Sequence, residues 1–227
     1  TFDIEGNDTA HKLAILTSLA FGTRIACDDI YLEGISNITI EDIRAADDLG
    51  FRIKLLGVAQ KTDTGIEQRV HPTMVPKESV IAQVDGVTNA DATASAVLGD
   101  IADIAKCQPG HQHGPVLGRP AVQLQPYVKA RMRSHEGGYF IRLTVEDRTG
   151  VFANLAKHMS DNGISLESIV QRPGRFGKGG TGEHKTVILV THATMEASVR
   201  KAVRSISSDG YLQDKPQVIR IERPGHH

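Results

Sequence analysis

The chain has 227 residues, of which 40% are hydrophobic and 23% are charged, and its 26 basic side chains nearly balance its 27 acidic ones. Such a composition is typical of a globular protein with one large or two ordinary domains. The balanced charge argues against a nucleic-acid-binding or membrane-surface protein, and the absence of any run of about 18 apolar residues argues against a membrane span.

The first half of the chain begins with helices and continues with strands. Residues 10–21 carry apolar side chains at helical spacing, with Asp8 placed to cap the helix and Gly22 placed to end it. The further elements expected in this half are a helix at 40–49 closed by Gly50, a hairpin of strands 51–60 and 66–72 around a turn at 61–65, a strand at 80–87 and a helix at 92–106.

The middle of the chain contains an unusual junction and a linker. The strand expected at 80–87 leads into the next helix almost without a connection, which indicates that a segment has been lost or omitted. Residues 108–120 are rich in Gly, Pro and His and predict a linker. His111 and His113 lie in it without Cys or carboxylate neighbours, so we predict no metal site.

The second half predicts a ferredoxin-like fold. Residues 177–182 read GKGGTG, but a dinucleotide-binding loop must follow a strand and open a helix, so we interpret them as a loop between strands. The expected βαββαβ order consists of strand 139–145, helix 151–162, strands 164–170 and 185–191, helix 195–207 and strand 217–222.

The cysteines and the start of the chain indicate a cytoplasmic protein. Cys27 and Cys107 match no metal-binding or redox spacing, so we expect two buried free thiols. No signal peptide is visible before the first expected helix.

Asp8 and Lys12 are the strongest candidates for chemistry. Residues four apart share one face of a helix, and an exposed ion pair with a helix cap explains them without any function. A lysine held beside a carboxylate can also bind or protonate a polar small molecule.

Residues 3–13, DIEGNDTAHKL, resemble the substrate-binding segment of homoserine dehydrogenase, D-x-x-G-x-D-x-x-x-K followed by an apolar helix. Other blocks of that family have counterparts in the same order. They are Gly34-Ile35, Asp42-Ile43, Ala46, Leu49-Gly50, Ile53-Lys54-Leu55, RVHPT at 69–73, TASAV at 93–97 and Asp100-Ile101.

The resemblance implies an oxidoreductase that reduces L-aspartate 4-semialdehyde to L-homoserine with NADP or NAD as cofactor, in threonine and methionine biosynthesis. Lys12 would bind the substrate and protonate its carbonyl oxygen as hydride arrives, and Asp3 and Asp8 would bind the amino end of the substrate. A cation placed there stabilises the transition state more than the ground state.

The chain also departs from the family. The N-terminal nucleotide-binding domain, a glutamate preceding residue 1 and an internal segment near Ala90 have no counterpart. The resemblance therefore implies a fragment that is inactive alone, with the cofactor bound mainly by the absent domain. The alternative is a non-catalytic, amino-acid-binding regulatory protein that retains a relic of the catalytic domain.

The second half resembles an ACT regulatory domain through residues 145–152, VEDRTGVF, and 162–169, NGISLESI. Thr149 replaces the proline that is usual in the first of these blocks. The resemblance implies L-threonine as effector and a homodimer or homotetramer, whereas a purely structural dimerisation module is the alternative. The implied effector-binding residues are Asp147, Gly150, Val151, Asn162 and Ile164.

The expected fold class is α+β. A partial catalytic and dimerisation domain with a mixed sheet would occupy residues 1–118, a linker residues 119–134, and a ferredoxin-like ACT domain residues 135–224.

Overall fold

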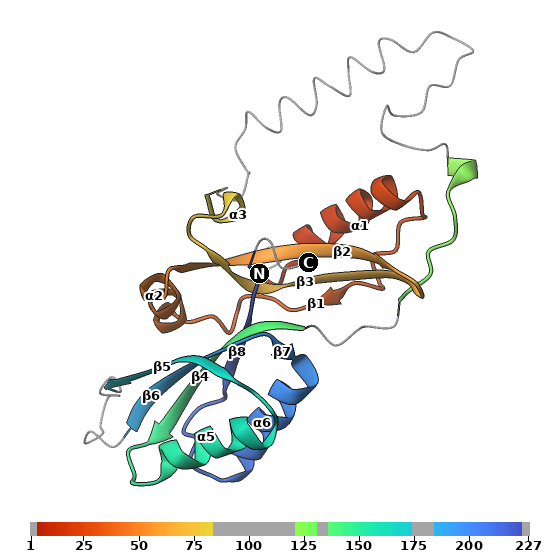
Figure 1. The fold of residues 1–227 in the computed structure, drawn as a ribbon. Helices are drawn as coiled ribbons and strands as arrows, with labels where there is room; N and C mark the ends of the chain where they lie inside the picture. Colours follow the sequence, from red (N-terminus) through yellow and green to blue (C-terminus); the bar gives the residue numbers. More distant parts are fainter. Residues whose placement is uncertain (1–3, 84–120, 131–135, 174–183, 224–227) are drawn as a thin grey trace. The chain divides into compact units, whose positions relative to one another are not determined.

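A computed structural model describes residues 4–83, 121–130, 136–173 and 184–223 (Figure 1). The chain forms two compact units, and their division differs from the expected linker boundary because strands β2 and β3 contribute residues to both. One unit consists of Thr1–Ile35, Leu55–His71 and Glu78–Met132, and the other consists of Ser36–Lys54, Pro72–Lys77 and Arg133–His227.

The first unit contains helix α1 and a hairpin of two long strands. Strands β2 (Phe51–Thr62) and β3 (Gly65–Pro76) pair with one another, which confirms the predicted hairpin, although both strands are longer than expected. The short strand β1 (Tyr31–Leu32) pairs in parallel with β3. Helix α1 packs its Ala10 and Leu13 against Val70 of β3.

Helix α1 (Asn7–Phe21) begins and ends at glycines in the left-handed conformation. Gly22 (φ 67°) ends the helix as predicted, and its N–H donates to the Ser18 carbonyl oxygen at 2.9 Å. The predicted capping role of Asp8 is wrong, because Gly6 (φ 83°) occupies the N-cap and no side chain caps the helix. Asp8 lies in the first turn, where a carboxylate is favourable beside the positive end of the helix dipole.

The prediction of a strand at 80–87 is wrong for residues 80–83, and residues 84–87 lie outside the described residues. Residues Val80–Gln83 form the short helix α3, in which the Ala82 N–H approaches both the carbonyl and the hydroxyl oxygen of Ser79. Val80 and Ile81, whose apolar side chains favoured a strand, are exposed, so no burial holds them extended. The helix predicted at 92–106, the linker at 108–120, Cys107, His111, His113 and the loop at 177–182 lie outside the described residues.

The second unit contains a four-stranded antiparallel sheet in the order β8-β4-β6-β5, with a further short strand beside β4. This order and connectivity confirm the predicted βαββαβ arrangement of the ferredoxin-like fold. Its elements are β4 (Glu136–Glu146), α5 (Val151–Asp161), β5 (Leu166–Pro173), β6 (His184–Thr191), β7 (Thr194–Met195), α6 (Glu196–Ser208) and β8 (Gln217–Ile221).

Helices α5 and α6 cover one face of this sheet (Figure 1). Alternate residues of β4 point toward them, as the period of two in a strand requires. The core on this face is contributed by β4, β6 and the two helices. It includes Tyr139, Ile141, Leu143, Val145, Val187, Leu189, Val151, Leu155, Met159, Val199, Ala202 and Ile206.

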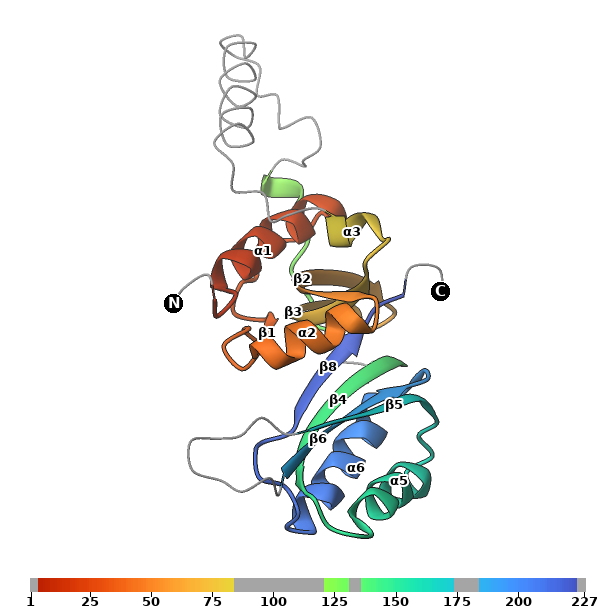
Figure 2. The same ribbon diagram turned by 90° about the vertical axis from the view of Figure 1, so that its left-hand side faces the viewer.

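Helix α2 (Ile40–Asp48) packs against the second apolar face of this sheet (Figure 2). This packing was not expected, because the predicted domains assigned α2 to the first half of the chain. The end of β3 belongs to the same unit and pairs in parallel with β8. The second core therefore combines residues from both halves of the sequence. It contains Ala45, Ala46, Met74, Phe140, Ile188, Val190, Ile219 and Ile221.

A buried ion pair joins α2 to β4. The Asp42 side chain is fully buried, and the Arg142 guanidinium donates to its two oxygens at 2.5 and 3.2 Å. Thr39 caps α2 reciprocally: its N–H and hydroxyl donate to Asp42 Oδ2, and its hydroxyl oxygen accepts from the Asp42 N–H. Asp42 thus connects the start of the helix to the sheet.

Two further expectations concern burial and membrane insertion. Cys27 is exposed, so the predicted burial of this thiol is wrong. Within the described ranges, each helix is too short or too polar to cross a membrane.

Candidate functional site

The predicted acid–lysine pair forms on the solvent-facing side of α1. Lys12 Nζ lies 2.6 Å from Asp8 Oδ2, and the two side chains are 60% and 44% exposed. A surface ion pair of this kind contributes little to stability, at most about 1 kcal/mol. The pair is open to a small molecule from solvent.

An apolar stripe continues from this pair along the same face of the helix. Ile15, Leu16 and Leu19 follow Lys12 at helical spacing and are 49%, 61% and 42% exposed. The opposite face carries the buried residues of the helix. Contiguous exposed apolar side chains often mark a surface that another domain or subunit covers.

Two glycines hold the backbone that leads into α1. A Cβ atom on Gly34 would lie 2.8 Å from the Glu5 Cα atom, which is closer than Cβ contacts allow, and one on Gly6 would lie 3.0 Å from Leu32 Cδ1. The Ile35 N–H donates to the Ile4 carbonyl oxygen at 3.0 Å. Close backbone packing therefore fixes residues 4–6 immediately before the Asp8–Lys12 pair.

The structure brings together two of the three predicted substrate-binding residues. Asp8 and Lys12 are in contact, whereas Asp3 lies outside the described residues. The positioning role of Gly34 was missed from the sequence, where this residue served only as part of a matching block. A glycine has no side chain, so only the neighbouring backbone reveals why it is needed.

The predicted effector-binding residues lie near opposite ends of α5. Gly150 (φ 90°) is the N-cap, Val151 begins the helix, and Asp147 forms an ion pair with Lys185 at 2.7 Å. The other two residues follow the C-terminal end of the helix. Asn162 is the C-cap and donates to the His158 carbonyl oxygen, and Ile164 is buried in the core.

The two groups are separated by the 11 residues of α5, a rise of about 16 Å. They do not form one pocket within a single chain. Val151 and Ile164 are almost fully buried, so their side chains support the fold more directly than they can contact a ligand.

The electrostatics of the second unit include one clearly shifted carboxyl group. Burial raises the pKa of Glu196, but hydrogen bonds and charge interactions with Arg220 and Arg200 outweigh it and hold the pKa below 4.5. The Arg220 guanidinium donates at 2.9 Å and the Arg200 guanidinium at 2.5 Å. These contacts connect the start of α6 to β8.

The described residues do not fit a dinucleotide site. In these ranges no strand leads through a G-x-G-x-x-G turn into a helix, which is the arrangement that holds a pyrophosphate. The turn from β4 into α5 contains a single glycine, Gly150, and begins with Asp147, directly after Glu146 at the end of β4. We therefore assign no described residue to a nucleotide.

Comparisons with known proteins point to one family. The family model described as homoserine dehydrogenase matches residues 1–106. Homoserine dehydrogenases of Neisseria gonorrhoeae and Helicobacter pylori are 35% and 36% identical to this chain, over 98% and 97% of its length and 55% of theirs. A homoserine dehydrogenase structure from Thiobacillus denitrificans has a TM-score of 0.80 and 36% identity, covering 99% of this chain and 55% of that one.

The chain thus spans about half the length of the curated relatives that it matches. The alignment with the N. gonorrhoeae protein extends over 247 positions, more than the 227 residues of this chain. That relative therefore also carries positions with no counterpart within the matched region.

Proposed function

Because the chain is a homologue of about half of a homoserine dehydrogenase, we propose that it provides the substrate-binding and regulatory parts of such an enzyme. The reaction is the reduction of L-aspartate 4-semialdehyde to L-homoserine with NADPH or NADH. The observation that carries the proposal is the contact of Asp8 with Lys12 on an exposed helix face, inside the residues that the family model matches.

Lys12 acts on the carbonyl oxygen of the aldehyde. As the carbonyl carbon is reduced, negative charge develops on the oxygen, and the Lys12 ammonium group stabilises that charge and donates a proton to it. Asp8, at 2.6 Å, holds the ammonium group on the exposed side of α1. Asp3 and Asp8 bind the substrate's own ammonium group.

The nicotinamide cofactor supplies the hydride when it is bound. The described residues do not fit it, so we assign its binding to a part of the enzyme without a counterpart in them. The apolar stripe of Ile15, Leu16 and Leu19 supports this assignment, because it offers a surface beside Lys12 that such a part would bury.

We further propose that the βαββαβ unit is an ACT domain that binds L-threonine in an oligomer of this chain in the cytoplasm. The separation of Asp147 and Gly150 from Asn162 along α5 favours a site completed by a second copy. L-threonine should then raise the melting temperature of the protein, and titration calorimetry without heat, together with an unchanged melting temperature, would leave only a structural role for the unit.

The catalytic role is tested by Lys12→Ala in the full-length enzyme. General acid catalysis typically contributes about 10²- to 10⁴-fold, so we expect kcat to fall by at least about 100-fold. Lys201→Ala is the matched control, because Lys201 is an exposed helical lysine on α6. Both variants should keep the circular dichroism spectrum of the parent.

Near-normal turnover by the Lys12→Ala variant would refute the role assigned to this lysine. The alternative function is a regulatory protein with a relic catalytic part. It predicts that the unmutated full-length protein has no turnover and still binds an amino acid. Turnover by the unmutated full-length protein therefore separates the enzyme from the regulatory protein.

A further inference from the structure

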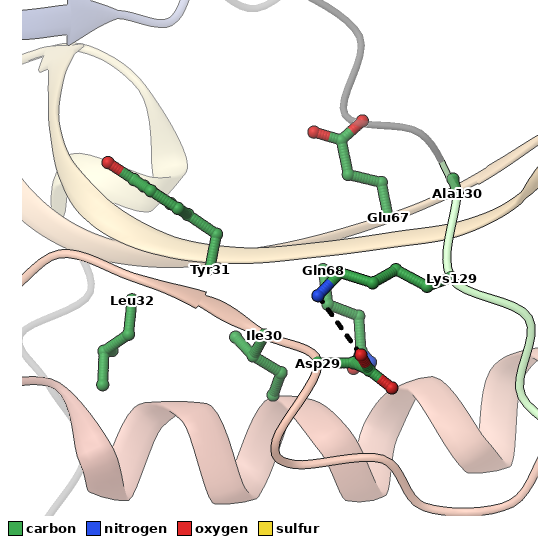
Figure 3. A pocket seen from close by; sticks show the side chains of 8 residues that line it. All are labelled: Asp29, Ile30, Tyr31, Leu32, Glu67, Gln68, Lys129 and Ala130. Carbon is green, nitrogen blue, oxygen red and sulfur yellow. Dashed lines mark ion pairs between the residues drawn. The ribbon is translucent and has the colours of Figure 1, made fainter.

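A cavity lies in the first unit where the edge of β3 changes its partner. The Ile66 N–H donates to Val128, and the Ile66 carbonyl oxygen accepts from Ala130, whereas Arg69 is paired with Tyr31 of β1. Between these two partners a cavity of about 260 Å³ opens beside β3 (Figure 3). Its lining residues are Asp29, Ile30, Tyr31, Leu32, Glu67, Gln68, Lys129 and Ala130.

Gln68 carries an amide oxygen for which the described residues supply no hydrogen-bond partner. The residue is 3% exposed, and its Nε2 donates to the Ala26 carbonyl oxygen at 3.3 Å. Its Oε1 is buried. A buried polar atom without a partner is unfavourable, so this lining residue gains a missing contact from a ligand group that reaches the oxygen and donates a hydrogen bond to it.

Opposite charges meet at the same cavity. Lys129 Nζ lies 3.2 Å from Asp29 Oδ1, and Figure 3 shows the two side chains pointing toward one another from separate segments, near Gln68. Both side chains are about half exposed, and a surface ion pair of this kind contributes little to stability. Either group can therefore exchange its partner for a charged group of a ligand.

The other acidic residue of the lining is already engaged. Glu67 is 5% exposed and lies 3.3 Å from the Arg69 guanidinium, so its charge is offset within β3. A ligand can therefore engage the Asp29 carboxylate and the Lys129 ammonium group, which are paired with one another, and the Gln68 amide oxygen. Ile30 and Leu32 supply apolar walls. A ligand that matches these polar groups carries a positive and a negative group close together.

We propose that this cavity binds a free α-amino acid with a short side chain. The ligand's ammonium group donates to Gln68 Oε1 and to the Asp29 carboxylate, and its carboxylate accepts from Lys129. The volume lies just below the range of about 300–1,000 Å³ that accommodates drug-sized ligands, which suits a compact molecule. The inference uses neither Asp8 nor Lys12, so it stands apart from the catalytic proposal.

The test is a titration of the full chain with L-threonine, L-homoserine and L-alanine, followed by backbone amide NMR and calorimetry. We expect at least one of them to shift the amide signals of residues 29–32, 67–68 and 129–130. The N-acetyl and the carboxamide derivatives of that amino acid each lack one charge. They should bind about tenfold or more weakly, since a charge-assisted hydrogen bond contributes about 1.5–3 kcal/mol.

Variants locate the site. Asp29→Asn, Lys129→Gln and Gln68→Leu should each weaken binding by about tenfold or more. Lys77→Gln is the matched control, because it opens a comparable exposed ion pair with Asp47 outside the cavity, and it should bind like the parent. Circular dichroism verifies that each variant is folded.

Three outcomes would overturn the proposal. One is that none of the three amino acids binds at millimolar concentration. Another is that binding persists unchanged in Asp29→Asn and Lys129→Gln. The third is that amino acids shift only the amides of residues 147–164, which would place binding in the βαββαβ unit and leave the catalytic proposal untouched.

Discussion

Removing the guanidinium from the buried Asp42–Arg142 pair should destabilise the second unit strongly. In Arg142→Met, an apolar side chain of similar length replaces the arginine and leaves the fully buried Asp42 carboxylate without its cation. Removing one partner of a buried pair typically costs about 3–5 kcal/mol. Because Thr39 still donates two hydrogen bonds to Asp42, we expect a loss near the lower limit, about 3 kcal/mol.

Urea unfolding followed by circular dichroism measures this loss as a lower midpoint at an unchanged slope. For a chain of this size, about 3 kcal/mol also corresponds to a melting temperature lower by about 6–12 °C. Hydrogen exchange should become faster at the amides of α2, since this helix loses its connection to β4.

Two further variants sharpen the result. Arg148→Met is the control, because its ion pair with Glu146 is exposed and should be worth less than about 1 kcal/mol. Adding Asp42→Asn to Arg142→Met removes the buried charge and should restore part of the stability. If Arg142→Met were no more destabilising than Arg148→Met, the ion pair would not hold α2 against the sheet.

Two other predictions concern backbone packing and pH. Gly34→Ala should destabilise the chain by about 1–3 kcal/mol and lower kcat/KM of the full-length enzyme, because its Cβ would meet the Glu5 backbone at 2.8 Å; unchanged unfolding and turnover would contradict that packing. The lowered pKa of Glu196 means that its carboxylate stabilises the fold above pH 4.5, and that this contribution is lost as the pH falls through the lower folded value. The stability advantage over Glu196→Gln should therefore shrink in that acidic range, and an advantage that stays constant in urea unfolding would contradict the assignment.

Local patterns predicted the elements of the second unit well. Leu155 and Met159 recur at helical spacing in α5, and Val199 and Ile206 do so in α6, so burial of one face required a helix. The βαββαβ order follows from these elements and the strands between them. Chain connectivity then leaves few topologies open.

The role of α2 was not predicted, although a signal was present. Tyr139, Phe140 and Ile141 form an apolar run in the sequence of β4, which is typical of a strand covered on both faces, and the structure buries all three side chains. The sequence does not say which distant element covers the second face, because amphipathic periodicity identifies a buried side and not its partner. The strand predicted at Val80–Gln83 was wrong for a related reason. The periodicity of a short apolar run does not distinguish a strand from a helix.

The two candidate sites also differ in how far the sequence predicts them. The Asp8–Lys12 contact follows from a spacing of four within one helix. The cavity between Asp29, Gln68 and Lys129 depends on three segments that meet only at the edge of β3, so no local pattern contains it.

The position of Asp42 within α2 also bears on how the chain folds during synthesis. Its partner Arg142 follows 100 residues later, and at about 5–20 residues per second the ribosome needs about 5–20 s to deliver it. β8, which completes the apolar face beneath α2, emerges later still. For several seconds, therefore, the nascent polypeptide carries an acidic helix whose apolar face has no sheet to pack against. During this time, chaperone binding or mispairing with a neighbouring nascent chain competes with native assembly.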